Sequence, residues 1–149
     1  MQNVFADEIK IIAGIPAIID ETIKRTVQEN DFVIKEYNIT KQLDEQGEDA
    51  KGKKIKPGYS NPYKRTRIKR GLQVEYVDTH FTGKFHAQLE IVAENGQFKI
   101  VSKLDYAEHV IKRYGKRILG IQQQYLADFV NDFLLPELKK AINGQLTKS

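Results

Sequence analysis

The sequence predicts a small α+β fold: an N-terminal helix, a small antiparallel sheet with an Asn-Gly hairpin, a C-terminal helix packed on the sheet, and a long basic loop. Three observations support this prediction: apolar residues at helical spacing towards both ends, alternating runs on either side of Asn95-Gly96, and a stretch of lysines and arginines before them. The chain has 149 residues, of which 40% are apolar. This is enough for one core, so we expect a single domain over residues 1–149.

The first helix is predicted from four apolar residues spaced four apart: Ile15, Ile19, Ile23 and Val27. This spacing places them on one face of a helix, and Pro16 is tolerated in its first turn. The following stretch, DFVIKEYNITKQLDEQ, allows two interpretations. Phe32 and Ile34 alternate as in a strand, whereas Phe32, Ile39 and Leu43 have helical spacing, and we favour the helix.

The hairpin is predicted from the runs FHAQLEIVA and QFKIVS, which meet at Asn95-Gly96, a pair suited to a two-residue turn. Closing the chain there pairs Ala93 with Phe98, Ile91 with Ile100 and Leu89 with Ser102, which places apolar residues on one face. The other face pairs Val92 with Lys99 and Glu90 with Val101, a mixed surface suited to water or a partner. The run GLQVEYV, with Leu72, Val74 and Tyr76 alternating, predicts a third strand.

The C-terminal third predicts two helical segments. Asp105 and Glu108 resemble a capping box at the start of the first, and Gly115 is placed to end it. The second begins near Gln122, and its apolar face includes Tyr125, Phe129 and Phe133. Pro136 should kink this helix or start a new one, and Asn143-Gly144 should close it.

The charge is unevenly distributed along the chain. Residues 1–50 carry 11 acidic and 5 basic side chains, whereas residues 51–70 carry nine basic and no acidic ones. Residues 47–62 have no apolar periodicity, so we interpret residues 47–70 as an extended basic loop or an assembly arm that orders on assembly. Its candidate assembly or phosphate contacts are Lys51, Lys53, Lys54, Lys56, Tyr59, Tyr63, Lys64, Arg65, Arg67, Lys69 and Arg70. The basic stretch therefore has three interpretations: an assembly arm, a surface that binds nucleic-acid phosphates, or a solvated loop held by Tyr59 and Tyr63.

Few residues point to catalysis. The absence of cysteine excludes disulfides, thiolate nucleophiles and cysteine-based zinc sites. The three histidines, His80, His86 and His109, lack metal-ligand spacing, and TGKF lacks the remaining residues of a phosphate loop. We therefore expect no enzyme activity, no cofactor and no metal, although a deep apolar pocket with converging polar groups would favour a small enzyme. No apolar run approaches the roughly 20 residues of a membrane span, and we expect a soluble protein without an export signal.

The order of elements from Val77 to Ile142 resembles the head-to-tail connector and tail-completion proteins of long-tailed bacteriophages. In that family a TG-x-[LF] step opens a hairpin, a Tyr-Ala pair begins the next segment, a glycine follows, and an apolar helix closes the domain. The matching positions here are Thr82, Gly83 and Phe85, then Tyr106 and Ala107, then Gly115, then the helix from about Gln122. Where the family often has a proline-phenylalanine-leucine step, this chain reads KRYGKRILGIQ.

This resemblance implies a structural virion protein, assembled in the host cytoplasm, that joins the capsid portal to the tail as one subunit of an oligomeric ring. Its implied partners are copies of itself, portal or adaptor proteins and tail proteins, with non-specific DNA contact in the lumen and no membrane. The alternative function is a small basic nucleic-acid-binding protein that uses the 51–70 loop, because clustered cations contact phosphates.

The assembly interpretation predicts that changing Lys64, Arg65, Arg67 and Arg70 together to Glu prevents assembly without unfolding the monomer. In a head-to-tail ring, the acidic N-terminal half of one copy would otherwise face the basic loop of the next. Particle assembly and the circular dichroism of the purified variant measure the two effects. Normal particles from this variant would contradict the prediction.

Overall fold

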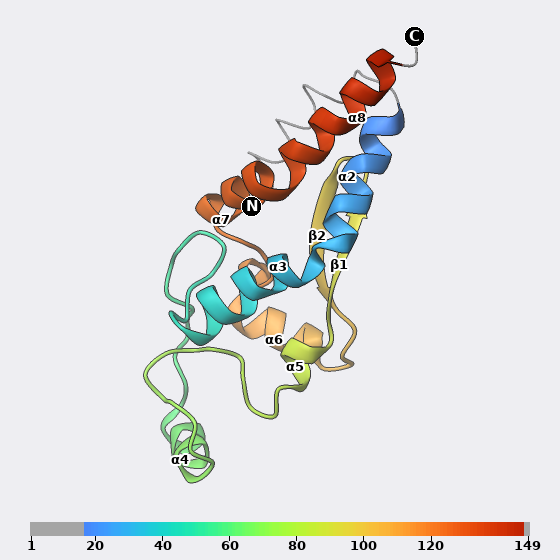
Figure 1. The fold of residues 1–149 in the computed structure, drawn as a ribbon. Helices are drawn as coiled ribbons and strands as arrows, with labels where there is room; N and C mark the ends of the chain where they lie inside the picture. The colour runs from blue at the N-terminus through green and yellow to red at the C-terminus, as the bar shows by residue number, and fades with distance from the viewer. Residues whose placement is uncertain (1–16, 148–149) are drawn as a thin grey trace.

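The computed structural model describes residues 17–147 and confirms the α+β class: helices pack with one two-stranded antiparallel sheet, and α2 runs along the hairpin (Figure 1). Helix α2 (Ala17–Glu29) is followed by α3 (Asp31–Lys35), which continues into a π-helix, η1 (Glu36–Asp44). The helical interpretation of the stretch after Asn30 is therefore confirmed. Two residues of the first predicted helix, Ile15 and Pro16, lie outside the described residues.

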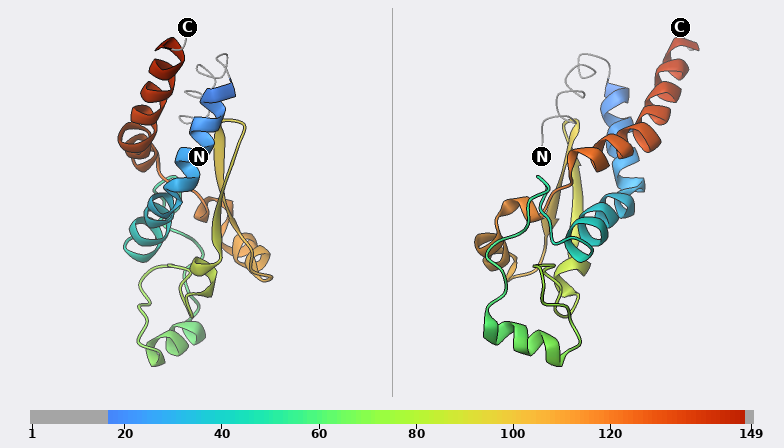
Figure 2. Two further views of the ribbon diagram at one scale, coloured as in Figure 1. Left: turned by 45° about the vertical axis from the view of Figure 1, so that its right-hand side comes forward. Right: turned by 90° about the vertical axis from the view of Figure 1, so that its left-hand side faces the viewer.

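Helix α2 supplies the centre of the core. Ile19, Ile23 and Val27 are buried, as their spacing predicts. The helix contacts both β1 and α8, and it runs beside α8 in the views of Figure 2. Complete burial of an aliphatic side chain contributes about 1.5–3 kcal/mol, so these three residues hold the sheet and the C-terminal helix together.

Strands β1 (Leu89–Glu94) and β2 (Gln97–Ser102) form the hairpin in the register expected from the sequence. Ala93 lies opposite Phe98, and Ile91 lies opposite Ile100. Asn95 and Gly96 connect the strands with φ angles of 51° and 71°, the left-handed conformation that a two-residue turn requires. Four residues of the hairpin are buried towards the core: Leu89, Ala93, Phe98 and Ile100.

The helix after the hairpin ends where the sequence predicts, but it does not begin with the predicted capping box. Helix α6 (Ala107–Tyr114) begins after Tyr106, without a side-chain cap, so the Asp105–Glu108 capping box is not formed. The backbone N–H of Ala107 instead bonds the carbonyl oxygen of Leu104, which closes a turn before the helix. Gly115 ends α6 with a φ of 94°, as predicted, and the short 3-10 helix η2 (Lys116–Ile118) follows.

The C-terminal helix has three parts: α7 (Gln123–Phe129), the π-helix η3 (Val130–Leu134) and α8 (Leu135–Thr147). The break falls where Pro136 predicts it, because proline cannot donate the hydrogen bond that would continue a regular helix. Asn143-Gly144 does not close the helix, since α8 continues to Thr147. The C-terminal helix meets the sheet at Phe129 of α7, whose ring contacts Phe98, whereas α8 packs against α2.

The predicted third strand is absent: residues 71–77 form no strand. The Gln73 side chain accepts hydrogen bonds from the backbone N–H groups of Glu75 and Tyr76 and donates to the carbonyl oxygen of Tyr76. These bonds turn the chain back on itself. Three of the backbone groups that a sheet would pair, on Glu75 and Tyr76, are therefore bonded locally.

The predicted extended loop over residues 47–70 is also wrong, because the segment contains a turn and a helix. Glu48 pairs with Lys54, and Ala50 and Ile55 are buried. Residues Asn61–Lys69 form helix α4, with Ser60 as its N-cap. Helix α4 lies at the end of the molecule farthest from α8 (Figures 1 and 2). Helical periodicity was not visible in the sequence because the buried residue of α4 is an arginine.

That arginine, Arg67, is fully buried and holds α4 in place. Its Nη2 donates to both carboxylate oxygens of Asp78 at 3.0 Å, and its Nε donates to the carbonyl oxygen of Gln73. Asp78 also accepts from the Tyr59 hydroxyl at 2.8 Å, from the Gln73 amide at 2.7 Å and from the backbone N–H of His80 at 2.8 Å. We call these five residues the Asp78 network.

Replacing Arg67 with Met should destabilise the protein by about 3–5 kcal/mol, because the Asp78 carboxylate would stay buried without its counter-charge. Urea denaturation followed by circular dichroism measures the loss, and hydrogen exchange tests whether the amides of α4 lose protection.

The matched control is Arg65→Met, which removes an exposed cation two residues away and should change stability by no more than about 0.5 kcal/mol. Equal stability of the two variants would show that the Asp78 network does not hold α4.

Candidate functional site

The most prominent chemical feature of the surface is the cationic face of α4. Lys64 is partly exposed, and Arg65, Lys69 and Arg70 are exposed. Within the described part of the chain, none of these four pairs with a carboxylate. Ile68, between them, is 61% exposed. Such a surface can bind phosphates or a carboxylate-bearing protein that also covers an apolar side chain.

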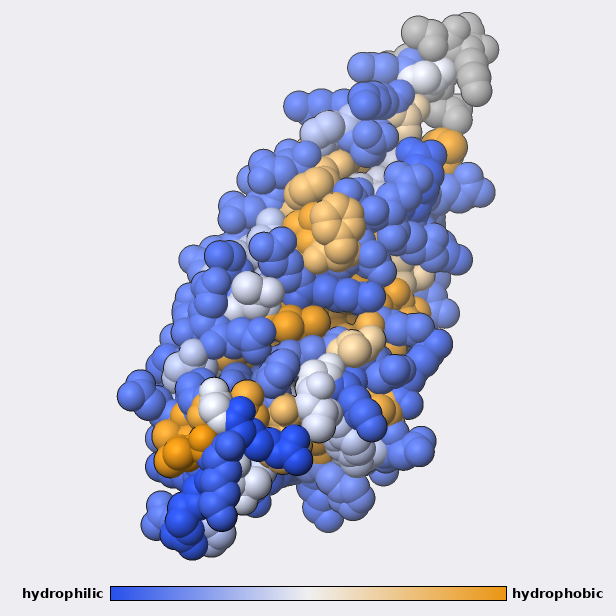
Figure 3. All heavy atoms as spheres, turned by 60° about the horizontal axis from the view of Figure 1, so that its bottom comes forward, coloured by the Kyte–Doolittle hydropathy of each residue, from blue (hydrophilic) through white to orange (hydrophobic). Residues whose placement is uncertain are grey.

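The first half of the basic stretch forms a tight turn with its cations outward. Lys51, Lys53, Lys54 and Lys56 are exposed. The backbone N–H groups of Lys51 and Lys53 donate to the Asp49 carboxylate at 2.8 and 3.0 Å, which orders the turn. Lys54 is the one of these four lysines with an ion pair in the described residues, 3.6 Å from Glu48. Figure 3 shows the molecule with its α4 end turned forward. Hydrophilic side chains cover most of this face, and smaller apolar areas lie between them.

Two predicted contact residues, Arg67 and Tyr59, are buried, and their assignment as assembly or phosphate contacts is therefore corrected. The Arg67 guanidinium lies 4.3 Å from the centre of the Tyr59 ring. Its hydrogen bonds go to the Asp78 carboxylate and to the backbone carbonyl oxygens of Gln73 and His80. Burial raises the pKa of the Tyr59 hydroxyl, which stays protonated and donates to Asp78. Both residues hold α4 through the Asp78 network, and Tyr59 also contributes to the lining of a pocket beside the helix.

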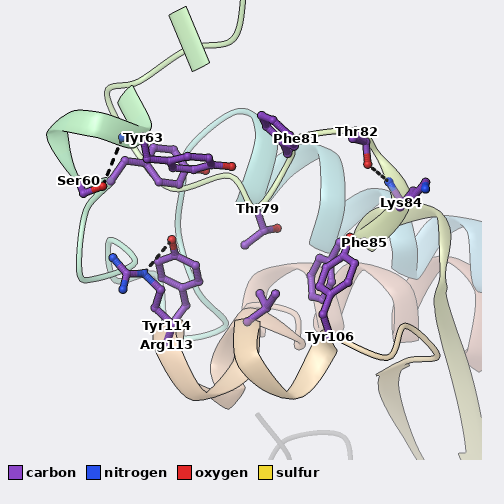
Figure 4. A pocket seen from close by; sticks show the side chains of 12 residues that line it. Ser60, Tyr63, Thr79, Phe81, Thr82, Lys84, Phe85, Tyr106, Arg113 and Tyr114 are labelled. Carbon is purple, nitrogen blue, oxygen red and sulfur yellow. Dashed lines mark hydrogen bonds between the residues drawn. The ribbon is translucent and has the colours of Figure 1, made fainter. Parts of the chain in front are cut away.

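Tyr63, half-buried, faces an open pocket of about 670 Å³ between α4, the 79–85 segment and α6. Six aromatic residues line it: Tyr59, Tyr63, Phe81, Phe85, Tyr106 and Tyr114. Figure 4 shows Tyr63 and Phe81 on one side and Tyr106, Arg113 and Tyr114 on the other. Sequence reasoning did not find this pocket, because its walls come from three separate segments.

The lining of this pocket is rich in aromatic residues and contains two cations, Lys84 and Arg113. Among the described residues that line it there is no histidine and no carboxylate. Ser60 serves as the N-cap of α4, and no general base lies beside it in the lining. Aromatic rings with Lys84 and Arg113 nearby are suited to receive an aromatic or apolar side chain, or a nucleic-acid base.

A second site lies beside the pocket, where the fold brings together Asp44, His80 and His86. One ligand atom from each of these residues lies within 4.8 Å of those of the other two. Asp44 ends η1, and His86 lies on the short helix α5 (Lys84–Ala87), which follows a left-handed turn at Gly83. The sequence gives no signal for this cluster, because Asp44 is far from the histidines along the chain.

The two ring nitrogens of His86 have different surroundings. Nε2 lies 3.0 Å from the carbonyl oxygen of Asp78 and 3.0 Å from the Thr79 hydroxyl, while Nδ1 lies 3.7 Å from an Asp44 carboxylate oxygen. Since a carbonyl only accepts, Nε2 carries a proton, and in the neutral imidazole Nδ1 then presents a lone pair. Burial lowers the pKa of His86, and burial raises the pKa of Asp44. Donors of this type can hold a metal ion.

Thr79 links this cluster to the Asp78 network through an unusual backbone conformation. Its φ is 58°, which a β-branched residue rarely adopts and which costs on the order of 1–3 kcal/mol. The Thr79 hydroxyl donates to the carbonyl oxygen of Asp78 at 2.6 Å. This turn places His80 and Asp78 so that the histidine ring approaches His86, with ring centres 5.4 Å apart.

Comparison with known proteins adds no assignment to these surfaces. Among the helices of residues 17–147, none combines the length and apolar character needed to cross a bilayer. No protein-family model, no curated protein and no solved structure matches the chain.

Proposed function

We propose that this protein is a non-enzymatic structural subunit of a tailed-bacteriophage virion that joins the capsid portal to the tail as one copy in a ring. The observation that carries the proposal is the cationic face of α4, which the Asp78 network holds at one end of the chain while its exposed cations lack carboxylate partners among the described residues. A surface of this kind is suited to contact another subunit.

The resemblance to connector proteins supplies the kind of assembly. Its motif positions fall on successive elements: the Thr82–Phe85 step leads through α5 into β1, Tyr106-Ala107 begins α6, and Gly115 ends it. The helix that closes the domain follows as α7, η3 and α8. Portal or adaptor proteins and tail proteins are the proposed neighbours of such a ring in the virion.

A complementary surface on the same chain supports a head-to-tail ring. Phe32 is 62% exposed, and Glu36, one helical turn further, is exposed on the same face. Asp128 and Asp132 are exposed and lie near Tyr37, the residue after Glu36. The pKa of Tyr37 is raised mainly by burial and then by the charges of these two carboxylates. The carboxylates near Phe32 and Tyr37 would complement the cations around the exposed Ile68 of α4, and two different surfaces that meet head to tail form a ring when the rotation between subunits closes.

Charge reversal on α4 tests this proposal. The variant changes Lys64, Arg65, Lys69 and Arg70 to Glu. Lys69 replaces the buried Arg67 in this set, because loss of Arg67 would leave Asp78 without its counter-charge and destabilise α4. We expect an unchanged circular dichroism spectrum and melting temperature but loss of higher oligomers in native mass spectrometry and sedimentation. Phage particles that depend on the variant should lack joined tails.

The matched control reverses four exposed cations elsewhere that have no ion pair among the described residues: Lys99, Lys112, Lys116 and Lys139. It carries the same net charge as the α4 variant and should assemble normally. Combining the α4 variant with Glu36→Lys, Asp128→Lys and Asp132→Lys in a second copy should restore mixed assembly. Assembly of the α4 variant alone to the normal extent would refute the proposed interface.

The second candidate function is nucleic-acid binding, which the aromatic pocket beside α4 favours. Phe81 lines the pocket and lies 4.4 Å from the Arg70 guanidinium, so a cation and a stacking surface are adjacent. Such pairs occur where proteins hold single strands. A DNA path through the lumen of a connector ring would use the same chemistry.

The test of this alternative is DNA affinity across a salt series, beside a variant with Lys64, Arg65, Lys69 and Arg70 changed to Ser. If all four contact phosphates, the slope of log affinity against log salt should weaken by about 3 to 4 in the variant. Micromolar binding near physiological salt that the variant loses would favour nucleic-acid binding. Equal, weak binding by both proteins would favour protein contacts.

A further inference from the structure

We propose that Asp44, His80 and His86 bind one Zn²⁺ ion per chain, with water as the fourth ligand, at the junction between η1 and the segment that carries the Asp78 network. This site is separate from the cationic face of α4, and its assignment does not depend on the proposed assembly function. Two imidazoles and one carboxylate are a donor set of known zinc sites, which keep an open position for water.

The three ligand atoms are slightly farther apart than they would be around a bound zinc ion, so a small movement of the side chains would complete the site. Tetrahedral bonds of about 2.0 Å to zinc place neighbouring ligand atoms about 3.3 Å apart. Nδ1 of His86 and Oδ1 of Asp44 are already 3.7 Å apart, and the ligand atoms of the other two pairs lie within 4.8 Å of each other. The Asp44 side chain is 40% exposed, so it has room to move and leaves a path for the ion from solvent.

His86 is oriented as zinc-bound histidines are. Their second ring nitrogen usually donates to a carbonyl or carboxylate, which fixes the ring and its tautomer. Here Nε2 donates to the carbonyl oxygen of Asp78, and the side chain is 8% exposed. The Nδ1 lone pair faces the Asp44 carboxylate, so two electron-rich atoms meet, and a cation between them would stabilise the arrangement.

The surrounding groups leave the three donors free for an ion. The Asp78 carboxylate, although close, accepts hydrogen bonds from Arg67, Tyr59, Gln73 and His80 and carries its counter-charge within the network. His80 enters that network through its backbone only: its N–H bonds Asp78 and its carbonyl oxygen accepts from Arg67. No side-chain hydrogen bond of His80 occurs within residues 17–147, although its ring packs against His86.

The ion would add a link between two parts of the chain that already meet where the Tyr76 hydroxyl donates to the carbonyl oxygen of Asp44. Asp44 belongs to the helical layer, where η1 is held by Asn38 and Gln42 against the 118–122 segment. His80 and His86 flank the turn that leads from the Asp78 network to β1. Zinc would therefore fix the α4 end of the molecule to its body and stabilise the chain.

The experiment uses the full chain without a histidine tag, stripped with a chelator and titrated with ZnCl₂ by calorimetry. We expect one site per chain with micromolar or tighter affinity. Co²⁺ in place of Zn²⁺ should give the visible absorption of a four-coordinate ion. Zinc at about 100 times its dissociation constant should raise the melting temperature by about 5–10 °C.

Two variants test the ligands: Asp44→Asn, which keeps the size of a partly exposed side chain, and His80→Gln. Each should lower zinc affinity by about 100-fold or more and abolish the cobalt absorption, while the zinc-free circular dichroism spectrum is unchanged. His86→Ala also removes a buried side chain. A loss of zinc affinity in this variant therefore counts as evidence only when its zinc-free circular dichroism spectrum matches that of the parent.

The control is His109→Ala, because His109 is exposed on α6 and belongs to no metal cluster among the described residues. Its zinc affinity should equal that of the parent. The proposal is overturned if the parent binds zinc more weakly than about 100 μM, or if Asp44→Asn and His80→Gln bind it as tightly as the parent does. The proposal is supported if Asp44→Asn and His80→Gln lose zinc binding while His109→Ala keeps it.

Discussion

The buried ion pair between Arg67 and Asp78 is the interaction on which one whole end of this protein depends. Burying two charges costs several kcal/mol each, and the pair is tolerated because nearly every polar atom of both side chains has a partner. Arg67 bonds Asp78 and two backbone carbonyl oxygens, while Asp78 also accepts from Tyr59, Gln73 and His80. Helix α4, the loop that returns from it and the approach to the hairpin all meet at this carboxylate.

The candidate sites are consequences of that same geometry. The turn after Asp78 gives Thr79 its left-handed backbone, and it brings His80 beside His86 and Phe81 beside Tyr63. The aromatic pocket and the Asp44–His80–His86 cluster therefore share one short segment, residues 78–86. Backbone strain at Thr79 persists because the surrounding hydrogen bonds determine the conformation on both sides.

The network also explains how a strongly basic stretch can be ordered and still expose most of its cations to solvent. One of its nine cations, Arg67, is neutralised inside the chain, and this fixes α4 without using the others. Lys64, Arg65, Lys69 and Arg70 then stay available, with Ile68 among them. A surface that is already ordered loses less conformational entropy on binding than a flexible loop would lose.

The sequence by itself determined the features that depend on neighbouring residues. The spacing of Ile19, Ile23 and Val27 predicted the buried face of α2, and Asn95-Gly96 with alternating neighbours predicted the register of β1 and β2. Only the tertiary structure decided that Arg67 is buried, that residues 71–77 are not a strand, and that Asp44 meets two histidines. Their partners are distant in sequence or are charged and polar groups, and apolar periodicity, which reports burial in a core, carries no information about a buried ion pair.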